Sequence, residues 1–444
     1  MKLPQDVQFC IQALEDASFS TYAVGGCVRD HLLGLTPQDF DLCTAATPTQ
    51  MQTVFAHHKL VLAGVKHGTV GVVTPSGVVE ITTFRTEGGY ADNRHPDWVE
   101  FVTDIESDLA RRDFTVNAMA WSPSRGLQDP FGGENDLKNG ILRAVGDPDQ
   151  RFREDALRIL RGLRFAARFH LTIEPGTYDA MLRQLPLVDN LANERVFDEL
   201  CKLLLHADLQ DLQTAAPILA RVIPELAPTM GFDQHSPYHA FDLYTHICHV
   251  TASVPAELCL RWAAILHDIG KIPTYTLDAT GRGHFYGHAK ESAAMADAIL
   301  LRLKAPTALR QQVVALISQH MTKLEPDRRF LRRRLSALGE QTLRQLICLQ
   351  TADMGGKGVR NDMDTVYFPP VQACLDQLLA EDACLSVQDL AVNGNDLMAL
   401  GLSGKDIGTC LNWLLEQVLD EALPNQQNNL LAAARQRMTP EEIK

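Results

Sequence analysis

The segment Tyr22-Ala-Val-Gly25-Gly26-Cys-Val-Arg29-Asp30 decides the fold at the amino-terminal end of the chain. Its pattern predicts a short strand that runs into a Gly-Gly turn, and the turn opens a helix. Backbone N–H groups in such a turn can approach a phosphate closely, and the amino terminus of a helix favours negative charge. Arg29, one turn into the helix, is placed to hold a phosphate oxygen. A Gly-Gly turn is more often only a turn, so this motif alone leaves both interpretations open.

The same pattern of short β-rich runs separated by glycines continues through residues 1–140. Apolar and β-branched runs predict strands at 21–26, 40–44, 69–74, 78–84 and 99–103, with a helix at 47–58 between them. From about residue 150 onward helical periodicity dominates almost without interruption. The sequence therefore predicts an α+β fold, in which a small α/β head precedes a long all-α body.

The composition is that of an ordinary globular protein. The 444 residues include 41 Lys and Arg against 55 Asp and Glu, which gives a formal net charge of −14. This acidity argues against a broadly basic nucleic-acid coat, although it does not exclude local basic patches. The ten cysteines form no CxxC pair, and no apolar run approaches the ~18 residues of a membrane span. We therefore expect reduced thiols, a cytoplasmic location, and neither a signal peptide nor a membrane partner.

Two carboxylates, Asp39 and Asp41, flank a phenylalanine shortly after Arg29. Alternation along the expected strand puts both on one face, where they can share divalent cations. Two carboxylates together with substrate phosphates are the usual ligands of magnesium in phosphoryl and nucleotidyl transfer. Glu80, in the middle of another expected strand, is a candidate third carboxylate, and a solvent-facing position is the alternative.

Residues 151–169 predict a single amphipathic helix with a ridge of arginines. At about 100° per residue its charged side chains share one stripe, and its apolar side chains lie on the opposite face. The stripe holds Glu154, Arg158, Arg161 and Arg168. Asp155 accepts hydrogen bonds and Arg158 donates them, so this pair can imitate a Watson–Crick partner for cytosine or adenine. A solvated basic face is the alternative.

Several motifs together resemble the polymerase-β-like nucleotidyltransferase superfamily. Its head pattern is matched by the Gly25-Gly26 turn, Arg29 and the carboxylates Asp39 and Asp41. Two further segments narrow the resemblance: Leu109-Ala-Arg-Arg112-Asp113-Phe-Thr-Val-Asn-Ala-Met119 and Asp129-Pro-Phe-Gly-Gly133, followed by Asp136. With them, the chain from residue 22 to about 200 resembles the class II tRNA nucleotidyltransferases, which comprise the CCA-adding enzymes and their bacterial poly(A) polymerase relatives.

The resemblance implies a reaction and a role for each matched residue. The reaction is addition of C, C and A to the tRNA 3′ end from CTP and ATP, without a nucleic-acid template. Asp39 and Asp41 would be catalytic and hold Mg²⁺. Glu154, Asp155 and Arg158 match the family's EDxxR template, which selects CTP and then ATP, with Glu154 as support. The other implied nucleotide contacts are Gly26, Arg29, Arg112, Arg161 and Arg164.

Two further segments match family elements. Glu194-Arg195 and Glu199 look like the element that closes and braces the neck. Residues 83–96 form an expected loop, which the family needs for the switch to adenosine addition. Arg85 and Arg94 keep this loop basic, but His95 stands where a second arginine often occurs. The sequence therefore leaves complete and partial addition open.

The helical body contains a second group of candidate functional residues, which are histidines and aspartates. His246, the adjacent pair His267 and Asp268, and Asp353 lie near the ends of separate expected helices. Imidazoles and carboxylates suit a transition metal that activates water. The set resembles an HD-type phosphohydrolase domain. Additional ligands or contacts would be His288, His320 and, for phosphate, Lys271. A hydrolytically silent, structural HD domain is the alternative.

The expected organisation has four parts: a nucleotidyltransferase head at 1–140, a helical neck at 141–205, an HD-type body at 206–360 and a tRNA-binding helical tail at 361–444. The arginines of 328–334 are candidate phosphate contacts or a solvated face. Rival functions are a poly(A) polymerase, an enzyme that adds only CC or only A, a phosphohydrolase with a nucleotide-sensing head, and an RNA-binding module without catalysis. The oligomeric state is not predicted.

Overall fold

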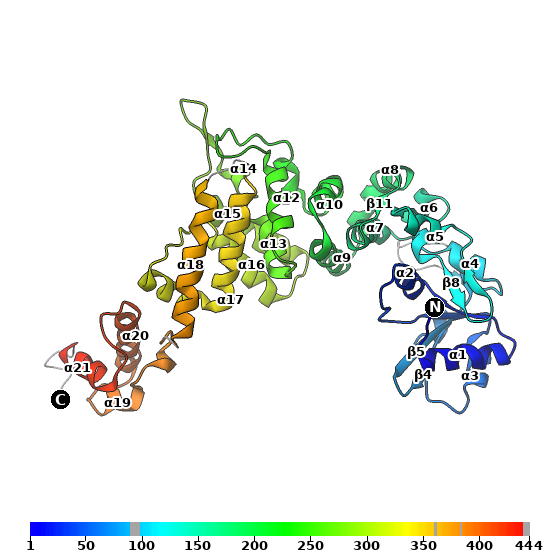
Figure 1. The fold of residues 1–444 in the computed structure, drawn as a ribbon, viewed down its shortest axis with the longest axis horizontal. Coiled ribbons are helices and arrows are strands. Elements are labelled where there is room, and N and C mark those ends of the chain that lie inside the picture. The colour runs from blue at the N-terminus through cyan, green and yellow to red at the C-terminus, as the bar shows by residue number, and fades with distance from the viewer. Residues whose placement is uncertain (89–97, 359–361, 382–383, 438–444) are drawn as a thin grey trace. The chain divides into compact units, whose positions relative to one another are not determined.

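The computed structural model describes residues 1–88, 98–358, 362–381 and 384–437 (Figure 1). The chain divides into two compact units. The first contains Met1–Ala227 and Arg302–Ala305, and the second contains Pro228–Leu301 and Pro306–Lys444. Among the described residues, no helix combines the length and the apolar character that a membrane crossing requires. The α+β fold class predicted from the sequence is confirmed.

A seven-stranded sheet forms the head of the first unit, with strand order β3-β4-β5-β2-β1-β8-β9. Its strands are β1 (Thr21–Val24), β2 (Leu42–Thr44), β3 (Leu60–Val61), β4 (Thr69–Thr74), β5 (Gly77–Thr83), β8 (Ala120–Ser122) and β9 (Gly126–Gln128). The strands β2 and β5 run parallel, with Leu42 opposite Ile81. The other neighbouring strands are antiparallel. Tyr22, Phe84 and Leu109 belong to a buried cluster on this sheet.

Short helices surround the sheet: α1 (Gln5–Asp16), α2 (Gly26–Leu32), α3 (Pro48–Val54), α4 (Ile105–Ala110) and α5 (Gly133–Lys138), with 3₁₀ turns η1 (Val65–His67) and η2 (Thr115–Asn117). Local chemistry explains where they begin. Thr47 and Gln50 form a capping box at α3, and Asp104 caps α4. Gly25 has φ +70°, a conformation that favours glycine, so β1 ends before it and α2 begins after it.

A separate two-stranded sheet lies partly within the expected loop and partly beyond it. It pairs β6 (Arg85–Gly88) with β7 (Trp98–Phe101), so part of the segment predicted as a loop is strand. Arg94 and His95 lie outside the described residues. The contribution of these two residues to adenosine addition therefore stays a prediction.

The neck continues the first unit as paired helices: α6 (Pro148–Glu154), α7 (Leu157–Phe169), α8 (Pro175–Gln184), η3 (Leu185–Asn190), α9 (Asn193–His206), α10 (Leu209–Thr214), α11 (Ala216–Val222) and η4 (Pro224–Thr229), with β10 (Ile141–Leu142) parallel to β11 (Thr172–Ile173). The prediction of one helix over 151–169 is wrong. Asp155 has extended dihedral angles, φ −143° and ψ 104°, and separates α6 from α7. Its side chain accepts a hydrogen bond from the Leu157 N–H at the start of α7, which compensates for the interrupted helix.

The second unit is helical. Its first part contains α12 (Leu243–Ser253), α13 (Leu258–Leu266), α14 (Lys271–Thr274), β12 (Thr276–Leu277), β13 (Gly283–His284), α15 (His288–Arg302), α16 (Thr307–Gln319) and α17 (Arg328–Gly355). The helix α17 is kinked at Gly339, where φ is +75°. Its last part contains α18 (Asp362–Ala380), η5 (Val387–Asp389), α19 (Gly394–Met398), α20 (Lys405–Leu419) and α21 (Gln427–Arg437). Leu397, Leu414 and Leu430 belong to a separate hydrophobic core in this tail.

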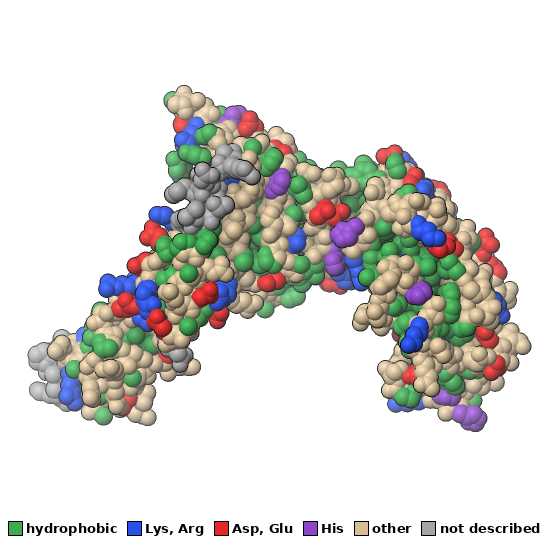
Figure 2. Space-filling view, viewed as in Figure 1, with side chains coloured by type: hydrophobic (Ala, Val, Ile, Leu, Met, Phe, Trp, Pro, Cys, Tyr) green, Lys and Arg blue, Asp and Glu red, His purple; other side chains and the backbone are tan. Residues whose placement is uncertain are grey.

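The arginines at the start of α17 have intramolecular partners. Arg328 pairs with Glu381 and Glu421, and Arg333 pairs with Asp420. Acidic and basic side chains are accordingly mixed on the surface of this part of the molecule (Figure 2). These contacts favour a role in joining α17 to the tail over the phosphate-contact interpretation.

Candidate functional site

A polar cavity of about 460 Å³ opens within the first unit. It brings together the glycine turn, the segment after α4, and the arginine face of α7. Its lining contains Gly25, Gly26, Arg29, Asp41, Arg111, Arg112, Asp113, Asn117, Asp155, Arg158, Arg161, Arg164, Phe165 and Arg168. Most of the nucleotide contacts implied by the sequence therefore meet in one place, although they come from segments more than a hundred residues apart.

The glycine turn forms one wall. A Cβ at Gly25 would lie 2.9 Å from the Arg112 guanidinium, so a side chain there would displace a cation of the cavity. Arg29 is buried and pairs with Asp30 at 2.6 Å. It also donates to the Asn117 side chain and lies over the Phe169 ring at 4.2 Å. Burial lowers the pKa of Arg29, and the Asp30 carboxylate opposes this shift. Arg29 thus holds the turn in place as well as facing the cavity.

Asp39 and Asp41 lie just before β2, not inside it, because pairing with β5 begins at Leu42. Both side chains are exposed, and Asp41 lines the cavity whereas Asp39 does not. Partial desolvation raises the pKa of Asp41, and Arg112 opposes this while the nearby Asp39 charge adds to it. Glu80 is exposed and precedes the residue paired with Leu42, so it lies beside Asp41 along the strand pair. Its role as a third carboxylate stays a prediction.

Asp155 and Arg158, the expected base-reading pair, each form an ion pair with another side chain. Glu154 is buried and accepts from Arg158 at 2.8 Å and from Arg151 at 2.6 Å. Arg158 also donates to the backbone oxygen of Arg111 at 3.0 Å. Asp155 is paired with Arg195 at 3.2 Å. The spacing of Asp155 and Arg158 in sequence predicted the pair, and Glu154 is a local partner of Arg158. The Arg111 oxygen and Arg195 are brought to the pair by the fold.

Two further arginines of the cavity are braced by buried acids. Arg161 pairs with Asp113, and Arg164 pairs with Glu199 at 2.8 Å. Asp113 also accepts from the Asn117 amide at 3.0 Å. Burial alone would raise the pKa of Asp113, but Arg161 and Asn117 outweigh it and lower that pKa to about 2. Arg161 therefore faces a carboxylate that stays charged at neutral pH.

Sequence reasoning gave no individual role to several lining residues, among them Asn117, Phe165 and Arg168. Asn117 connects the Arg29 side chain with Asp113. The Arg164 guanidinium lies over the Phe165 ring, 4.2 Å from the ring centroid. Asn117 lies inside a segment that matched the family, but nothing in the pattern distinguished it from its neighbours. Arg168 lay in the predicted stripe without an assigned function.

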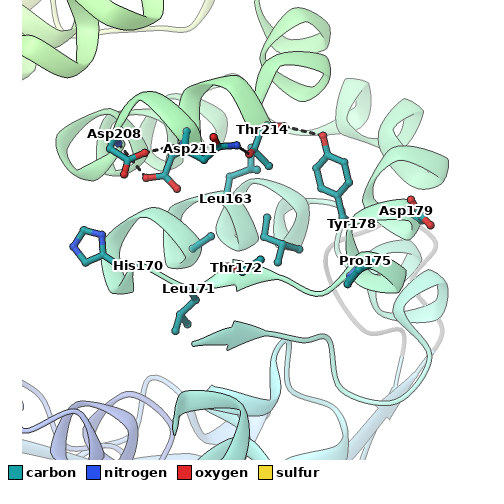
Figure 3. A pocket seen from close by; sticks show the side chains of 13 residues that line it. Leu163, His170, Leu171, Thr172, Pro175, Tyr178, Asp179, Asp208, Asp211 and Thr214 are labelled. Atoms are coloured by element: carbon teal, nitrogen blue, oxygen red, sulfur yellow. Dashed lines mark hydrogen bonds between the residues drawn. The ribbon is translucent and has the colours of Figure 1, made fainter. Parts of the chain in front are cut away.

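A second cavity of about 460 Å³ lies within the neck, lined in part by the opposite side of α7 (Figure 3). Leu163 and Leu171 line its apolar side, and Asp208 and Asp211 line its acidic side. These two carboxylates are used in the capping box of α10. The Tyr178 hydroxyl donates to the backbone oxygen of Thr214 at 2.7 Å. The sequence gave no indication of this cavity.

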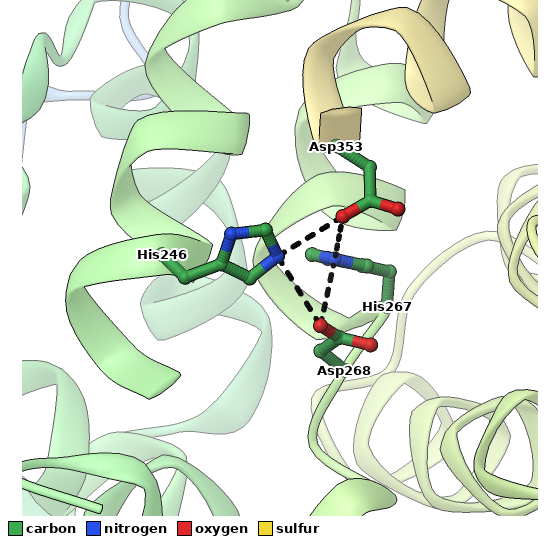
Figure 4. Close-up of side chains that lie close together, drawn as sticks. All are labelled: His246, His267, Asp268 and Asp353. Carbon is green, nitrogen blue, oxygen red and sulfur yellow. Dashed lines mark ion pairs between the residues drawn. The ribbon is translucent and has the colours of Figure 1, made fainter. Parts of the chain in front are cut away.

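In the second unit, His246, His267, Asp268 and Asp353 converge (Figure 4). His246 Nε2 lies 3.3 Å from Asp268 Oδ2 and 3.1 Å from Asp353 Oδ1. His267 Nε2 lies 3.2 Å from the same oxygen of Asp268. The two imidazole nitrogens are buried and have no well-directed hydrogen bond to a described residue, and Asp268 Oδ2 is buried with Lys271 Nζ 2.7 Å away. A metal ion would satisfy the two unpaired nitrogens and share the carboxylate.

A second group shares Asp268 with the first. His288 and His320 approach its other oxygen, Oδ1, at 3.4 and 3.6 Å. The two carboxylate oxygens of Asp268 therefore each face a pair of histidines. This arrangement has two adjacent candidate metal positions with one bridging carboxylate.

The histidine tautomers fit metal binding. In all four rings, Nδ1 lies within hydrogen-bond distance of a backbone oxygen: Gly356 for His246, Ala264 for His267, Phe285 for His288 and Ile317 for His320. A proton on Nδ1 directs the lone pair of the neutral ring onto Nε2, toward the carboxylates. Without metal, burial opposes the charge of His267, but Asp268 and Asp353 raise its pKa to about 10. Metal binding would therefore displace a proton there.

Models of known families match separate parts of the chain. The poly A polymerase head domain matches residues 21–143, the HD domain matches 238–354, and the probable RNA and SrmB-binding site of polymerase A matches 170–229. The CCA-adding enzyme of Limosilactobacillus fermentum is 33% identical over 425 residues, which cover 96% of this chain and 94% of that relative. This chain belongs to the family of CCA-adding enzymes.

Other comparisons agree with this membership. The CCA-adding enzyme of Latilactobacillus sakei is 33% identical and covers 96% of both chains. The crystal structure of the Bacillus stearothermophilus CCA-adding enzyme in complex with CTP superposes with a TM-score of 0.71, at 25% identity over 98% of both chains. The Thermotoga maritima CCA-adding enzyme complexed with tRNA has the same fold, with a TM-score of 0.62 and 20% identity over 97% of this chain and 95% of that one. The family predicted from the sequence is confirmed.

Proposed function

We propose that this chain adds C, C and A to the 3′ end of tRNA from CTP and ATP, without a nucleic-acid template. The observation that carries the proposal is the cavity in which the glycine turn, Asp41 and the arginines of α7 face one another. One wall suits phosphates and another carries the base-reading pair, so one nucleoside triphosphate can engage both. Membership in the CCA-adding enzyme family supports the same reaction.

The wall of the cavity that suits phosphates is positively charged, and its backbone is accessible at the glycine turn. Gly26 begins α2 without a side chain in the way, and Arg112, Arg161 and Arg164 surround the space. Their buried partner acids hold the guanidiniums in position before substrate arrives. Fixed cations cost little reorganisation when charge develops on the transferred phosphoryl group.

Asp39 and Asp41 fit Mg²⁺ and would hold it. Both are hard oxygen ligands, both are exposed, and neither forms an ion pair with a described residue. When bound, Mg²⁺ would neutralise the triphosphate and lower the pKa of the RNA 3′-hydroxyl. Desolvation raises the pKa of Asp41, and the charge of Asp39 adds to this shift.

Base selection would come from Asp155 and Arg158. The Asp155 carboxylate can accept from the exocyclic amino group of cytosine or adenine, and Arg158 can donate to ring or carbonyl acceptors. Arg195 occupies only part of the acceptor capacity of Asp155. Uracil and guanine present the opposite pattern of donors and acceptors at the corresponding positions, so they would leave partly buried polar groups unpaired.

The proposal is tested with tRNA transcripts that end before CCA, after C and after CC, supplied with CTP and ATP separately and together. We expect two cytidines and then one adenosine, with arrest at the complete end. A continuing A tail would make the chain a poly(A) polymerase. Arrest after CC, or addition of A only, would make it a partial enzyme.

We also propose that residues 361–444 contact tRNA and that the chain acts in the cytoplasm. The tail has a hydrophobic core of its own, which includes Leu397 and Leu430, so it can present a fixed surface. A chain that ends at residue 383 should bind tRNA more weakly in a band-shift assay and retain CTP binding.

A second proposed activity is metal-dependent hydrolysis of a phosphoester by the HD cluster. It is favoured by the four Nε2 atoms that face the shared carboxylate of Asp268. A transition metal there would supply a Lewis acid and a water of lowered pKa. Water adds to phosphorus as the bond to the leaving oxygen breaks, giving a phosphate and an alcohol. Hydrolysis of bis(p-nitrophenyl) phosphate with added Mn²⁺ or Ni²⁺ tests this activity, and its absence would favour a structural HD domain.

A further inference from the structure

A cavity of about 270 Å³ opens beside the HD cluster within the second unit. Asp268, Asp353 and His288 lie at its inner end. Lys271, Arg282 and Lys357 also line it, and Lys271 lies 2.7 Å from Asp268. Three cations in one small cavity favour an anionic group such as phosphate next to the cluster.

The mouth of this cavity is formed by a short hairpin that local hydrogen bonds hold in one shape. β12 pairs with β13, and the Asp278 carboxylate closes the turn between them. It accepts from the backbone N–H groups of Thr280 and Arg282, at 2.8 and 3.1 Å. His284 Nε2 lies 2.8 Å from its other oxygen. The residues that follow are therefore presented from a fixed turn.

Flat side chains at this mouth leave large faces open to solvent. Tyr286 is 79% exposed, and its ring is stacked on His284 with an angle of 6° between the planes. Tyr238 is 57% exposed and lies 5.1 Å from the Arg282 guanidinium. We call Tyr238, Arg282, His284 and Tyr286 the lip. Exposed aromatic and guanidinium planes are the groups on which unpaired nucleobases stack.

We propose that the lip is a base-stacking subsite, which makes the HD cavity specific for a nucleoside that carries a phosphate. The phosphate would lie among the cations, and the base would stack on the exposed face of Tyr286 or of Tyr238. This inference rests on the proposed HD activity and adds the determinant of its substrate class. The same chemistry is offered by a mononucleotide and by the last nucleotide of an RNA with a 3′-phosphate.

The test measures binding by the full chain with isothermal titration calorimetry. AMP is compared with ribose 5-phosphate, which has the same phosphate and sugar but no base. Tyr286→Ala should weaken AMP binding about tenfold, the scale of one base–aromatic stack, and leave ribose 5-phosphate unchanged within twofold. Tyr286→Phe should restore AMP binding, because stacking needs the ring and not the hydroxyl.

Two controls separate the lip from other sites. Leu277→Ala changes an exposed apolar side chain of the same hairpin that does not line the cavity, so it should leave AMP binding unchanged. The head also recognises nucleotides in our proposal. The comparison is therefore repeated in an Asp155→Ala background, where the effect of Tyr286→Ala should persist.

Three outcomes would overturn the subsite: AMP binding that Tyr286→Ala leaves unchanged, equal weakening of AMP and ribose 5-phosphate, or loss of the effect in the Asp155→Ala background. A short RNA with a 3′-phosphate, titrated in parallel, shows which source binds more tightly. Hydrolysis of bis(p-nitrophenyl) phosphate is assayed separately. If hydrolysis is absent but the Tyr286 effect is present, the HD activity fails while the subsite stands.

Discussion

At the scale of single residues, the cavity of the head separates groups that act on substrate from groups that hold them. Asp41 and Asp155 face the cavity. Glu154, Asp113 and Arg195 orient the cations and carboxylates that lie there. The two kinds of residue should therefore respond differently to substitution.

Asp39→Ala or Asp41→Ala should reduce nucleotide addition by at least about a thousandfold, the scale on which charge stabilisation contributes to phosphoryl transfer. Binding of tRNA should stay within about threefold, because both carboxylates serve the chemistry. Single-turnover incorporation and band-shift assays measure the two effects. Near-normal addition by both variants would remove the metal assignment.

Asp155→Ala should lower selectivity for CTP over UTP by about 1–3 kcal/mol, the value of one paired base contact. Arg195→Ala should reproduce part of this loss, because Arg195 orients the Asp155 carboxylate. Competition between CTP and UTP on a tRNA lacking CCA measures the ratio. Unchanged rejection of UTP in the Asp155 variant would show that this residue does not read the base.

The ion pair of Asp113 should make stability depend on pH in acid. Its pKa is lowered to about 2 in the folded chain from its ordinary 3.8, so the contribution is complete above the unfolded value and is lost as pH falls through the folded one. This shift corresponds to about 2 kcal/mol. The stability difference between the native chain and Asp113→Asn, from urea unfolding, should therefore shrink between about pH 4 and pH 2. A constant difference would contradict the assignment.

At the scale of elements, the position of α15 depends on one glycine. A Cβ at Gly270 would lie 2.4 Å from the backbone nitrogen of Ser292 and 2.6 Å from the backbone oxygen of His288. A side chain there would push α15 away from the end of α13, and His288 would move with it.

Gly270→Ala should therefore destabilise the second unit by about 1–3 kcal/mol, the usual cost of overpacking. It should also weaken metal binding by the HD cluster. Thermal unfolding and metal titration measure these effects. Gly281→Ala is a control for the loss of a glycine, because a Cβ there meets no atom within 4 Å, although its φ of +79° adds some strain. Equal stability of the Gly270 variant and the native chain would show that α15 can shift without cost.

At the scale of the whole molecule, the two chemical centres share no residue. The cavity of the head is lined by residues of the first unit, and the HD cluster lies in the second. Each set of proposed ligands is complete within its own unit.

His267→Ala should therefore leave CCA addition within about twofold and abolish metal-stimulated phosphoester hydrolysis. His320→Ala is a second variant with the same expected split, in case the loss of His267 disturbs folding. Both activities are measured on the same preparations, with circular dichroism to verify the fold. If CCA addition is lost in a folded variant, the two centres are coupled and our division of the chain is wrong.

The sequence alone determined the family and the fold class, and it predicted the residues that we propose carry the chemistry. It could do so because a glycine turn, a DxD pair and an EDxxR segment are local patterns whose chemistry depends on residue type and short spacing. Gly25-Gly26 and β1 with α2 were predictable for that reason: positive φ at Gly25 requires a residue without a Cβ.

Only the tertiary structure decided how these groups are held. The break at Asp155 could not be read from a periodicity that continues through it. The hydrogen bond from the Leu157 N–H is local, but the pair with Arg195 depends on a residue that folding brings close. The partners of Arg161, Arg164 and Arg328 are likewise distant in sequence. The periodicity of a sequence shows which face of a helix or strand is buried. It does not show which distant elements pack together, and that packing decides which charges pair and which residues form the lip of the HD cavity.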